Sequence, residues 1–91
     1  MNKLVDKKQL SDDVFRMTFE APYIAEARKA GQFIIIQLDD NFGERIPLTI
    51  ADADEEAGTI TIIFQAVGKT TITLSALEVG DHIANVLGPL G

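Results

Sequence analysis

Apolar and polar residues alternate with a period of two in several short segments of this chain, and turn signals separate those segments. The clearest case is VFRMTFEA (14–21), in which Phe15, Met17 and Phe19 occupy every second position. Successive residues of a β-strand face opposite sides of a sheet, so this pattern predicts a strand with one buried face. The segment QFIIIQL (32–38) is β-branched and aromatic and too short for a buried helix, which also favours a strand.

Four further strands and two short helices complete the predicted pattern. The other predicted strands cover residues 2–10, 45–52, 59–67 and 82–88, and the predicted helices cover 23–30 and 71–79. Gly31 and Gly80 stand where the helices should stop. Turns recur about every eight to twelve residues, a spacing typical of a small antiparallel barrel or sandwich. We therefore predict an all-β fold, a six-stranded antiparallel Greek-key barrel with one or two short helices, because closing the sheet removes its exposed edges.

Two proline-containing segments and the phenylalanines give more local predictions. Pro47 cannot donate to a strand ladder, so it should lie at an edge, a bulge or a strand start. The segment VLGPLG (86–91) combines Gly-Pro with paired glycines and predicts a sharp turn after the last strand. The side chains expected in the hydrophobic core are Phe15, Phe19, Phe33 and Phe64.

Length and composition exclude several classes of protein and of site. The 91 residues make at most one small domain. With no cysteine and one histidine, His82, we expect no disulfide, no metal centre and no histidine-based catalytic triad. The net charge of −6 disfavours nucleic acid and anionic membranes as partners. No signal-peptide core is seen at the N-terminus, and the apolar run FIIIQL is too short to span a bilayer, so a soluble cytoplasmic protein is expected.

The segment GKTT (68–71) directly follows a predicted strand and precedes a predicted helix. The first N–H groups of a helix lack intrahelical partners and carry partial positive charge, so a phosphate can bind there. Lys69 adds positive charge, and Thr70 or Thr71 can donate a hydroxyl to an anion. The same threonines can instead cap the helix after an ordinary turn, which the motif alone favours. The spacing of a Walker loop is absent.

The segment GERIPLTIAD (43–52) is a second candidate site. Arg45 can bind a phosphate through two N–H groups. Pro47 and Leu48 make a stiff apolar wall, and Thr49 offers a hydroxyl beside it, an arrangement that suits a flat heteroaromatic ligand. The alternative is an edge strand with a surface arginine, which this motif alone favours.

The order of these motifs is more specific than any one of them. The tripeptide GQF stands before a strand, and R-x-P-L-T-I, the strand TIIFQ, G-x-x-T at a helix start, L-x-x-G-D and GPLG follow in turn. This series resembles the FAD-binding barrel of the ferredoxin–NADP reductase superfamily over essentially the whole chain. Within the superfamily it is similar to the electron-transfer subunits of dihydroorotate dehydrogenase, of sulfide dehydrogenase and of NADH-dependent ferredoxin:NADP oxidoreductase.

The resemblance implies which residues bind FAD. In the family, the element matched by residues 47–49 lines the flavin, with Thr49 near its redox-active nitrogen and Leu48 against its ring. Residues 63–65 match the strand that passes the ribityl chain and adenosine, and the turn at 68–71 matches the pyrophosphate site. The implied cofactor-binding residues are Arg45, Pro47, Leu48, Thr49, Ile63, Phe64, Gln65, Gly68, Thr70 and Thr71.

The arginine departs from the family pattern. Ile46 occupies the position where the family's arginine often stands, and Arg45 comes one residue early. Because successive strand residues face opposite ways, Arg45 should miss the phosphate unless a bulge re-aims it.

The resemblance also implies what accompanies this domain. In the family, an NAD(P)H-binding domain follows GPLG, and the electron-transfer subunits carry cysteines for a 2Fe-2S cluster. This sequence has no G-x-G-x-x-G and no cysteine, so residues 1–91 are expected to be the FAD-binding fragment. The parent subunit would pass electrons between NAD(P)H, FAD and the iron–sulfur cluster beside a catalytic large subunit. The fragment itself would have no catalytic side chain and little activity.

A different class of function remains as the alternative. The chain could be a non-enzymatic small β-barrel that binds a protein partner, with GKTT acting only as a helix cap. A nucleic-acid-binding barrel is disfavoured by the negative charge and by the few aromatic residues.

Overall fold

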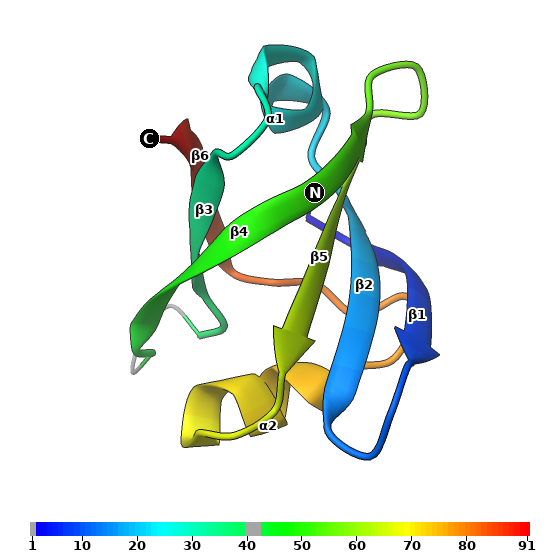
Figure 1. Ribbon diagram of the computed structural model, residues 1–91, viewed down its shortest axis with the longest axis vertical. Coiled ribbons are helices and arrows are strands. Elements are labelled where there is room, and N and C mark those ends of the chain that lie inside the picture. Colours follow the sequence, from blue (N-terminus) through cyan, green and yellow to red (C-terminus); the bar gives the residue numbers. More distant parts are fainter. Residues whose placement is uncertain (1, 40–42) are drawn as a thin grey trace.

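The residues that the structure describes form six strands and two short helices (Figure 1). The computed structural model describes residues 2–39 and 43–91. In chain order the elements are β1 (Leu4–Gln9), β2 (Val14–Glu20), α1 (Pro22–Ala27), β3 (Phe33–Gln37), β4 (Arg45–Asp54), β5 (Thr59–Gln65), α2 (Lys69–Ser75) and β6 (Asn85–Leu90). The prediction of an all-β chain with six strands and two short helices is confirmed. Neither helix of the described residues is long enough to cross a bilayer.

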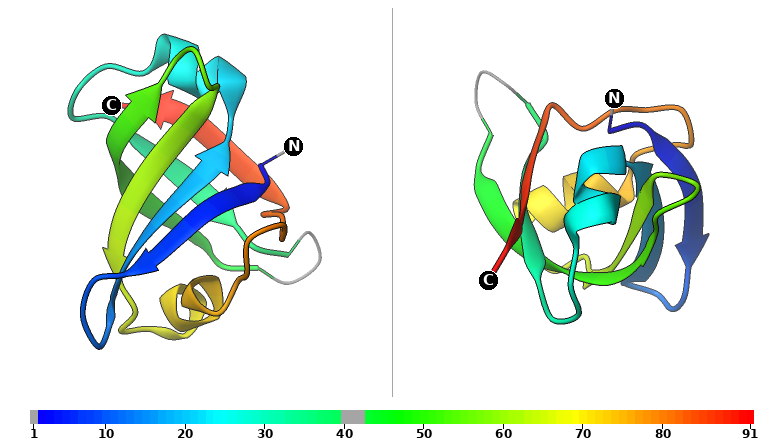
Figure 2. Two further views of the ribbon diagram at one scale, coloured as in Figure 1. Left: turned by 90° about the vertical axis from the view of Figure 1, so that its right-hand side faces the viewer. Right: turned by 90° about the horizontal axis from the view of Figure 1, so that it is seen from above.

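All strand pairs are antiparallel, and the strands follow the order β1-β2-β5-β4-β3-β6. The long strand β4 belongs to both halves of the sheet, because its first half pairs with β3 and its second half with β5. The sheet curls around the core, as the two views of Figure 2 show. In the strand order, β1 and β6 stand at opposite ends, so the pairing of the described strands does not close the sheet into the predicted barrel.

The core follows from the predicted alternation. The inward-facing residues of β2 and β5 include Met17, Phe19, Ile60 and Ile62, each at most 1% exposed. The helices lie at opposite ends of the strands (Figures 1 and 2), and α2 contributes the fully buried Leu74. Burial of such side chains stabilises the fold by roughly 1.5–3 kcal/mol each.

The prediction for the phenylalanines holds in part. Phe19 and Phe64 are buried, and Phe15 packs against the core with its ring stacked on Phe64 at 6.0 Å between centroids. Phe33 lies outside the core cluster, because the neighbouring Ile34 takes the inward position on β3. The β-branched and aromatic composition predicted that strand correctly, but it did not decide which of its faces is buried.

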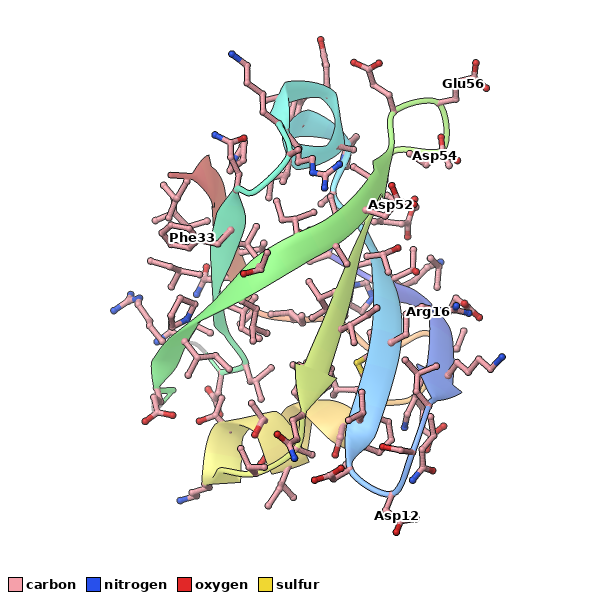
Figure 3. All side chains as sticks on the ribbon, in the orientation of Figure 1. Asp12, Arg16, Phe33, Asp52, Asp54 and Glu56 are labelled. Carbon is pink, nitrogen blue, oxygen red and sulfur yellow. The ribbon has the colours of Figure 1, made fainter. Side chains whose placement is uncertain are left out.

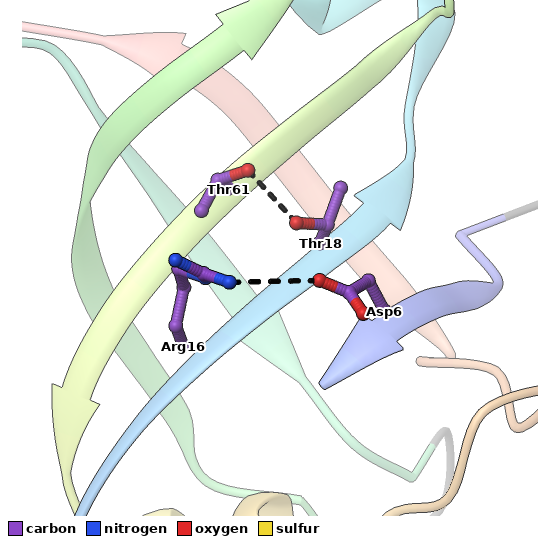
Figure 4. A network of polar contacts seen from close by, with 4 residues as sticks. All are labelled: Asp6, Arg16, Thr18 and Thr61. Atoms are coloured by element: carbon purple, nitrogen blue, oxygen red, sulfur yellow. Dashed lines mark hydrogen bonds and ion pairs between the residues drawn. The ribbon is translucent and has the colours of Figure 1, made fainter. Parts of the chain in front are cut away.

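The outer face of β1, β2 and β5 carries polar contacts (Figure 4). The Thr18 and Thr61 hydroxyls form a hydrogen bond of 2.9 Å across β2 and β5, and Arg16 and Asp6 form an ion pair at 3.9 Å. Exposed ion pairs of this kind add at most about 1 kcal/mol. This face is therefore a solvated surface with polar contacts between its strands.

Several element boundaries differ from the predicted ones. Pro22 does not merely end β2; it opens α1, because proline fits the first turn of a helix, where its missing N–H is not needed. The helix α2 begins at Lys69, two residues before the predicted start, and ends earlier, at Ser75. Pro47 pairs only with Ile35 of β3 in the ladders of the described residues, as expected of a proline on a strand with one open side.

The predicted sharp turn at VLGPLG is wrong. Strand β6 continues through Gly88 and Pro89 and stays paired with β3, whose register shifts between Phe33 and Ile35. Gly88 is needed there because a Cβ atom at this position would lie 2.9 Å from Ile34 Cγ2 and 3.2 Å from the carbonyl oxygen of Phe33. The glycine lets the two backbones approach, so the signal taken for a turn marks close strand packing.

We expect Gly88→Ala to lower the free energy of unfolding by about 1–3 kcal/mol, because the added methyl group overpacks β3 against β6. Chemical denaturation followed by far-UV circular dichroism measures this change. Leu87→Ala is the control on the same strand, because that side chain is 62% exposed, and it should change stability by less than about 0.5 kcal/mol. Equal stability of the Gly88 variant and the wild type would contradict the packing argument.

Candidate functional site

The candidate site lies where β4 separates from β5. The ladder between these strands ends at the pair Ile50–Ile62, with a register shift between Ile50 and Asp52. From Arg45 to Thr49 the strand β4 pairs with β3 instead, while the end of β5 stays with β2. The two strands therefore diverge, and α2 begins below the space between them (Figure 1).

The first half of β4 presents three of the predicted residues on one side. Arg45, Pro47 and Thr49 are exposed, whereas Ile46 and Leu48 are half-buried and pack against the core. The register with β3 is unbroken over this stretch, so no bulge is required for Arg45 to share a face with Thr49. Arg45 therefore lies on the same face as Pro47 and Thr49 without a bulge, whereas Leu48 lies on the opposite face from Pro47, with which it was predicted to form an apolar wall.

The outer face next to Pro47 and Thr49 is apolar. Across the sheet, Thr49 pairs with Phe33, and Pro47 pairs with Ile35. Paired residues of neighbouring strands share a face, and Ile35 also pairs with Leu87 of β6. Figure 3 shows Phe33 at the β3 and β6 side of the molecule. An apolar surface with one hydroxyl at its margin results, unlike the polar contacts on the outer face of β2 and β5.

On β5 the predicted residues fall on both faces. Ile63 is 48% exposed and Gln65 is exposed, whereas Phe64 is buried in the core. The Gln65 amide donates a 2.7 Å hydrogen bond to the carboxylate of Asp13. A ligand on the outer face can therefore contact Ile63 and Gln65, whereas Phe64 packs in the core on the other side of the strand.

At the start of α2 the two threonines have different roles. The Thr71 hydroxyl accepts hydrogen bonds from the backbone N–H groups of Val67 and Gly68, at 3.1 and 3.0 Å, and donates to the Gly68 carbonyl at 3.1 Å. Thr71 therefore holds the turn that precedes the helix, which is the capping alternative. Gly68 is N-cap, and its exposed backbone leaves the approach to the helix open.

Thr70 faces β4 instead. Its hydroxyl donates a 2.7 Å hydrogen bond to the Glu44 carboxylate, directly before β4. These residues line a cavity of about 430 Å³ together with Lys69 and Thr73 of α2 and with Leu38, Asp39 and Gly43. A negatively charged oxygen thus already accepts from the threonine hydroxyl in a cavity that Lys69 also lines. This is the chemistry that a phosphate needs, so the residues present fit a phosphate-bearing cofactor.

Sequence reasoning missed the polar residues that hold the connection between β3 and β4. Gln37 is 8% exposed and is the one buried polar residue in the described part of the chain. Its amide donates to the Gly43 carbonyl at 3.2 Å and accepts from the Asn85 amide at 2.9 Å. The sequence feature that could have pointed to this buried polar residue was the single glutamine inside the apolar run FIIIQL. Its position there fixes Glu44 relative to β6.

Comparison with protein families identifies the domain. The family model described as the oxidoreductase FAD-binding domain matches residues 1–91. A Thermotoga maritima protein, a homolog of the electron transfer subunit of dihydroorotate dehydrogenase B (NAD(+)), is 42% identical over 91 residues, which are 100% of this chain and 32% of the relative. The corresponding Fusobacterium nucleatum subunit is 32% identical over 85 residues, 91% of this chain and 32% of the relative. An uncharacterized Clostridium beijerinckii protein is 57% identical over the full chain, which is 30% of its length.

Solved structures agree with this family. A chain of the NADH-dependent reduced ferredoxin–NADP oxidoreductase superposes with a TM-score of 0.97 at 42% identity, over 100% of this chain and 33% of its own length. The cytochrome b5 reductase domain of Ulva prolifera nitrate reductase gives a TM-score of 0.80 at 25% identity, over 98% and 38%. The chain thus spans about a third of the length of its relatives. Because the family model covers every residue, the chain belongs to the oxidoreductase FAD-binding domain family, within the ferredoxin–NADP reductase superfamily that the motif order predicted.

Proposed function

We propose that this FAD-binding domain is part of an oxidoreductase electron-transfer subunit, which passes electrons between NAD(P)H, FAD and an iron–sulfur cluster. One observation carries the placement of the cofactor. Thr49, Pro47 and Arg45 are the exposed residues in the first half of β4. Glu44, which directly precedes this strand, accepts a hydrogen bond from Thr70 of α2. The apolar face with its hydroxyl and the groups that can donate hydrogen bonds to an anion therefore follow one another along β4 and on to α2.

Each part of FAD would have its own set of contacting residues along β4 and α2. The diphosphate would lie at Thr70 and Arg45, next to the open turn at Gly68. The flavin ring would lie against Pro47, with the Thr49 hydroxyl at its redox-active nitrogen. When bound, FAD supplies the redox chemistry, and the chain binds and orients it.

The other predicted contacts have less direct roles. The exposed residues Ile63 and Gln65 would flank the ribityl chain and adenosine, with Phe64 as the core support behind them. Thr71 would act by holding the turn through its three backbone hydrogen bonds. Leu48 faces the core, so its contact with the ring would be through its backbone.

The role as a subunit rests on the relatives. The Thermotoga maritima and Fusobacterium nucleatum proteins are named as electron transfer subunits or their homologs. This chain covers about a third of each, so the NAD(P)H site and the iron–sulfur cluster would belong to further domains, with residues 1–91 as the FAD-binding part. A catalytic large subunit would be the partner, and the cytoplasm would be the location. A non-enzymatic partner-binding module is not favoured, because the FAD-domain model spans the whole chain.

We further infer that the sheet completes a Greek-key barrel through the start of β1. Lys3 and His82 form an antiparallel bridge, and Leu4 exchanges backbone hydrogen bonds of 2.8 Å with Asp81 and Gly80. These contacts tie β1 to the segment before β6, the two ends of the strand order. They support closure, although β1 and β6 share no ladder among the described residues.

Thr70→Ala should weaken FAD binding by roughly three- to tenfold, because one hydrogen bond to a charged oxygen is lost. Titration of the chain with FAD, followed by flavin fluorescence and the visible spectrum, measures the affinity. The control is Ser75→Ala, because Ser75 is on the same helix but its hydroxyl donates to the Ile72 carbonyl and does not line the cavity, and it should leave the affinity within twofold. Free-flavin behaviour of FAD at saturating wild-type protein would favour the partner-binding alternative.

Thr49→Val should weaken the binding of riboflavin and of FAD by the same factor, roughly three- to tenfold, because it removes a hydroxyl at the ring and keeps the side-chain shape. The same titrations with both ligands test this. Thr70→Ala should by contrast affect FAD and leave riboflavin unchanged, since riboflavin has no phosphate. A Thr49 variant that lost affinity for FAD alone would place the ring elsewhere.

A further inference from the structure

The hydrogen bond between Thr70 and Glu44 occupies a donor of the proposed diphosphate site. A threonine hydroxyl has a single proton to donate. In this structure that proton goes to Glu44 Oε1, at 2.7 Å. Thr70 can therefore donate to Glu44 or to a phosphate oxygen of the cofactor, but not to both at once.

The charges add to this competition. Glu44 is exposed and lines the same cavity as Lys69 and Thr70, together with a second acidic residue, Asp39. A diphosphate in that place would lie a few ångströms from the Glu44 carboxylate, and two like charges at that distance repel each other. The carboxylate thus stands where a phosphate oxygen would be held, on the same hydroxyl and beside the same lysine.

The rest of the fold keeps Glu44 near this place. Gly43, the residue before it, is held by the Gln37 amide at 3.2 Å, and Gln37 is in turn held by Asn85 at 2.9 Å. A Cβ atom at Gly43 would lie 2.7 Å from the Asp39 carbonyl oxygen, so the backbone of Gly43 packs tightly against that of Asp39. The backbone of Glu44 is anchored, and its side chain alone is free to leave Thr70.

We propose that Glu44 is an internal competitor for the diphosphate of FAD, which lowers the affinity of the domain by occupying Thr70 with its carboxylate. This inference rests on the proposed function, because it takes Thr70 as a diphosphate donor. Binding of FAD displaces the carboxylate from the hydroxyl, and the cost of that displacement sets how tightly FAD is held. Glu44 is thus an affinity-determining residue that acts through another residue and does not itself bind the cofactor.

Glu44→Ala tests the proposal, because it removes both the carboxylate oxygen that accepts from Thr70 and the negative charge. We expect FAD to bind this variant roughly three- to fivefold more tightly than the wild type, from the size of exposed charge interactions. Riboflavin, which has no phosphate, should bind both equally. The gain for FAD should shrink in high salt, because salt screens exposed charges. Fluorescence titration of the 91-residue chain with each ligand gives these values.

Glu56→Ala is the matched control. It removes the same charge at the turn between β4 and β5, which Figure 3 shows at the opposite end of the molecule from α2. A gain in FAD affinity in the Glu44 variant alone supports the proposal, and an equal or absent gain in both variants overturns it. The double variant with Thr70→Ala gives a second test: the gain should shrink in that background, and an undiminished gain overturns competition for the hydroxyl.

The failure of this inference differs from the failure of the proposed function. Saturable FAD binding to the wild type without a gain in the Glu44 variant overturns the competition and leaves the FAD site in place. If FAD shows no saturable binding to the wild type or to the Glu44 variant, the proposed site itself is overturned. Circular dichroism of each variant confirms that the fold is retained, which is expected because Glu44 and Glu56 are exposed.

Discussion

The exchange of partners along β4 is the constraint on which the rest of the structure depends. Its second half pairs with β5 and its first half with β3, with a register shift after Ile50 at the change. One strand thus joins the two halves of the sheet and bends away from β5 as it does so. The space opened by that bend is where α2 starts, so the exposed side of β4 and the N-terminal turn of the helix become neighbours.

The second constraint is a chain of polar contacts that leads from β6 through β3 to the start of β4 and on to α2. It runs from Asn85 on β6 through the buried Gln37 on β3 to Gly43, and from Glu44 to Thr70. A buried amide must satisfy its hydrogen bonds, so this part of the network defines one geometry. The last contact, between two exposed side chains, is easily broken. The scaffold is therefore fixed while the outermost contact can exchange with a ligand.

The outer surface of the sheet differs in chemistry between its two halves. Hydrogen bonds and an ion pair cover β1, β2 and β5, for example between Thr18 and Thr61 (Figure 4). The outer face of β3, β4 and β6 presents Ile35, Pro47 and Leu87 instead. Exposed apolar surface of this kind is typical of a binding site. The family found by comparison binds FAD, whose flavin ring is flat and apolar on its faces.

Local pattern determined most of what the sequence could predict: the six strands, the two helices, the lack of cysteine chemistry and, through motif order, the FAD-binding family. These features depend on neighbours in the chain, and period-two alternation or a motif records them directly. The face on which Leu48 lies, the divergence of β4 from β5 and the strand role of Gly88 depend on pairing between distant segments. The same holds for the contact between Glu44 and Thr70, 26 residues apart. Only the tertiary structure decided these, because register and close approach between strands are set by packing across the sheet.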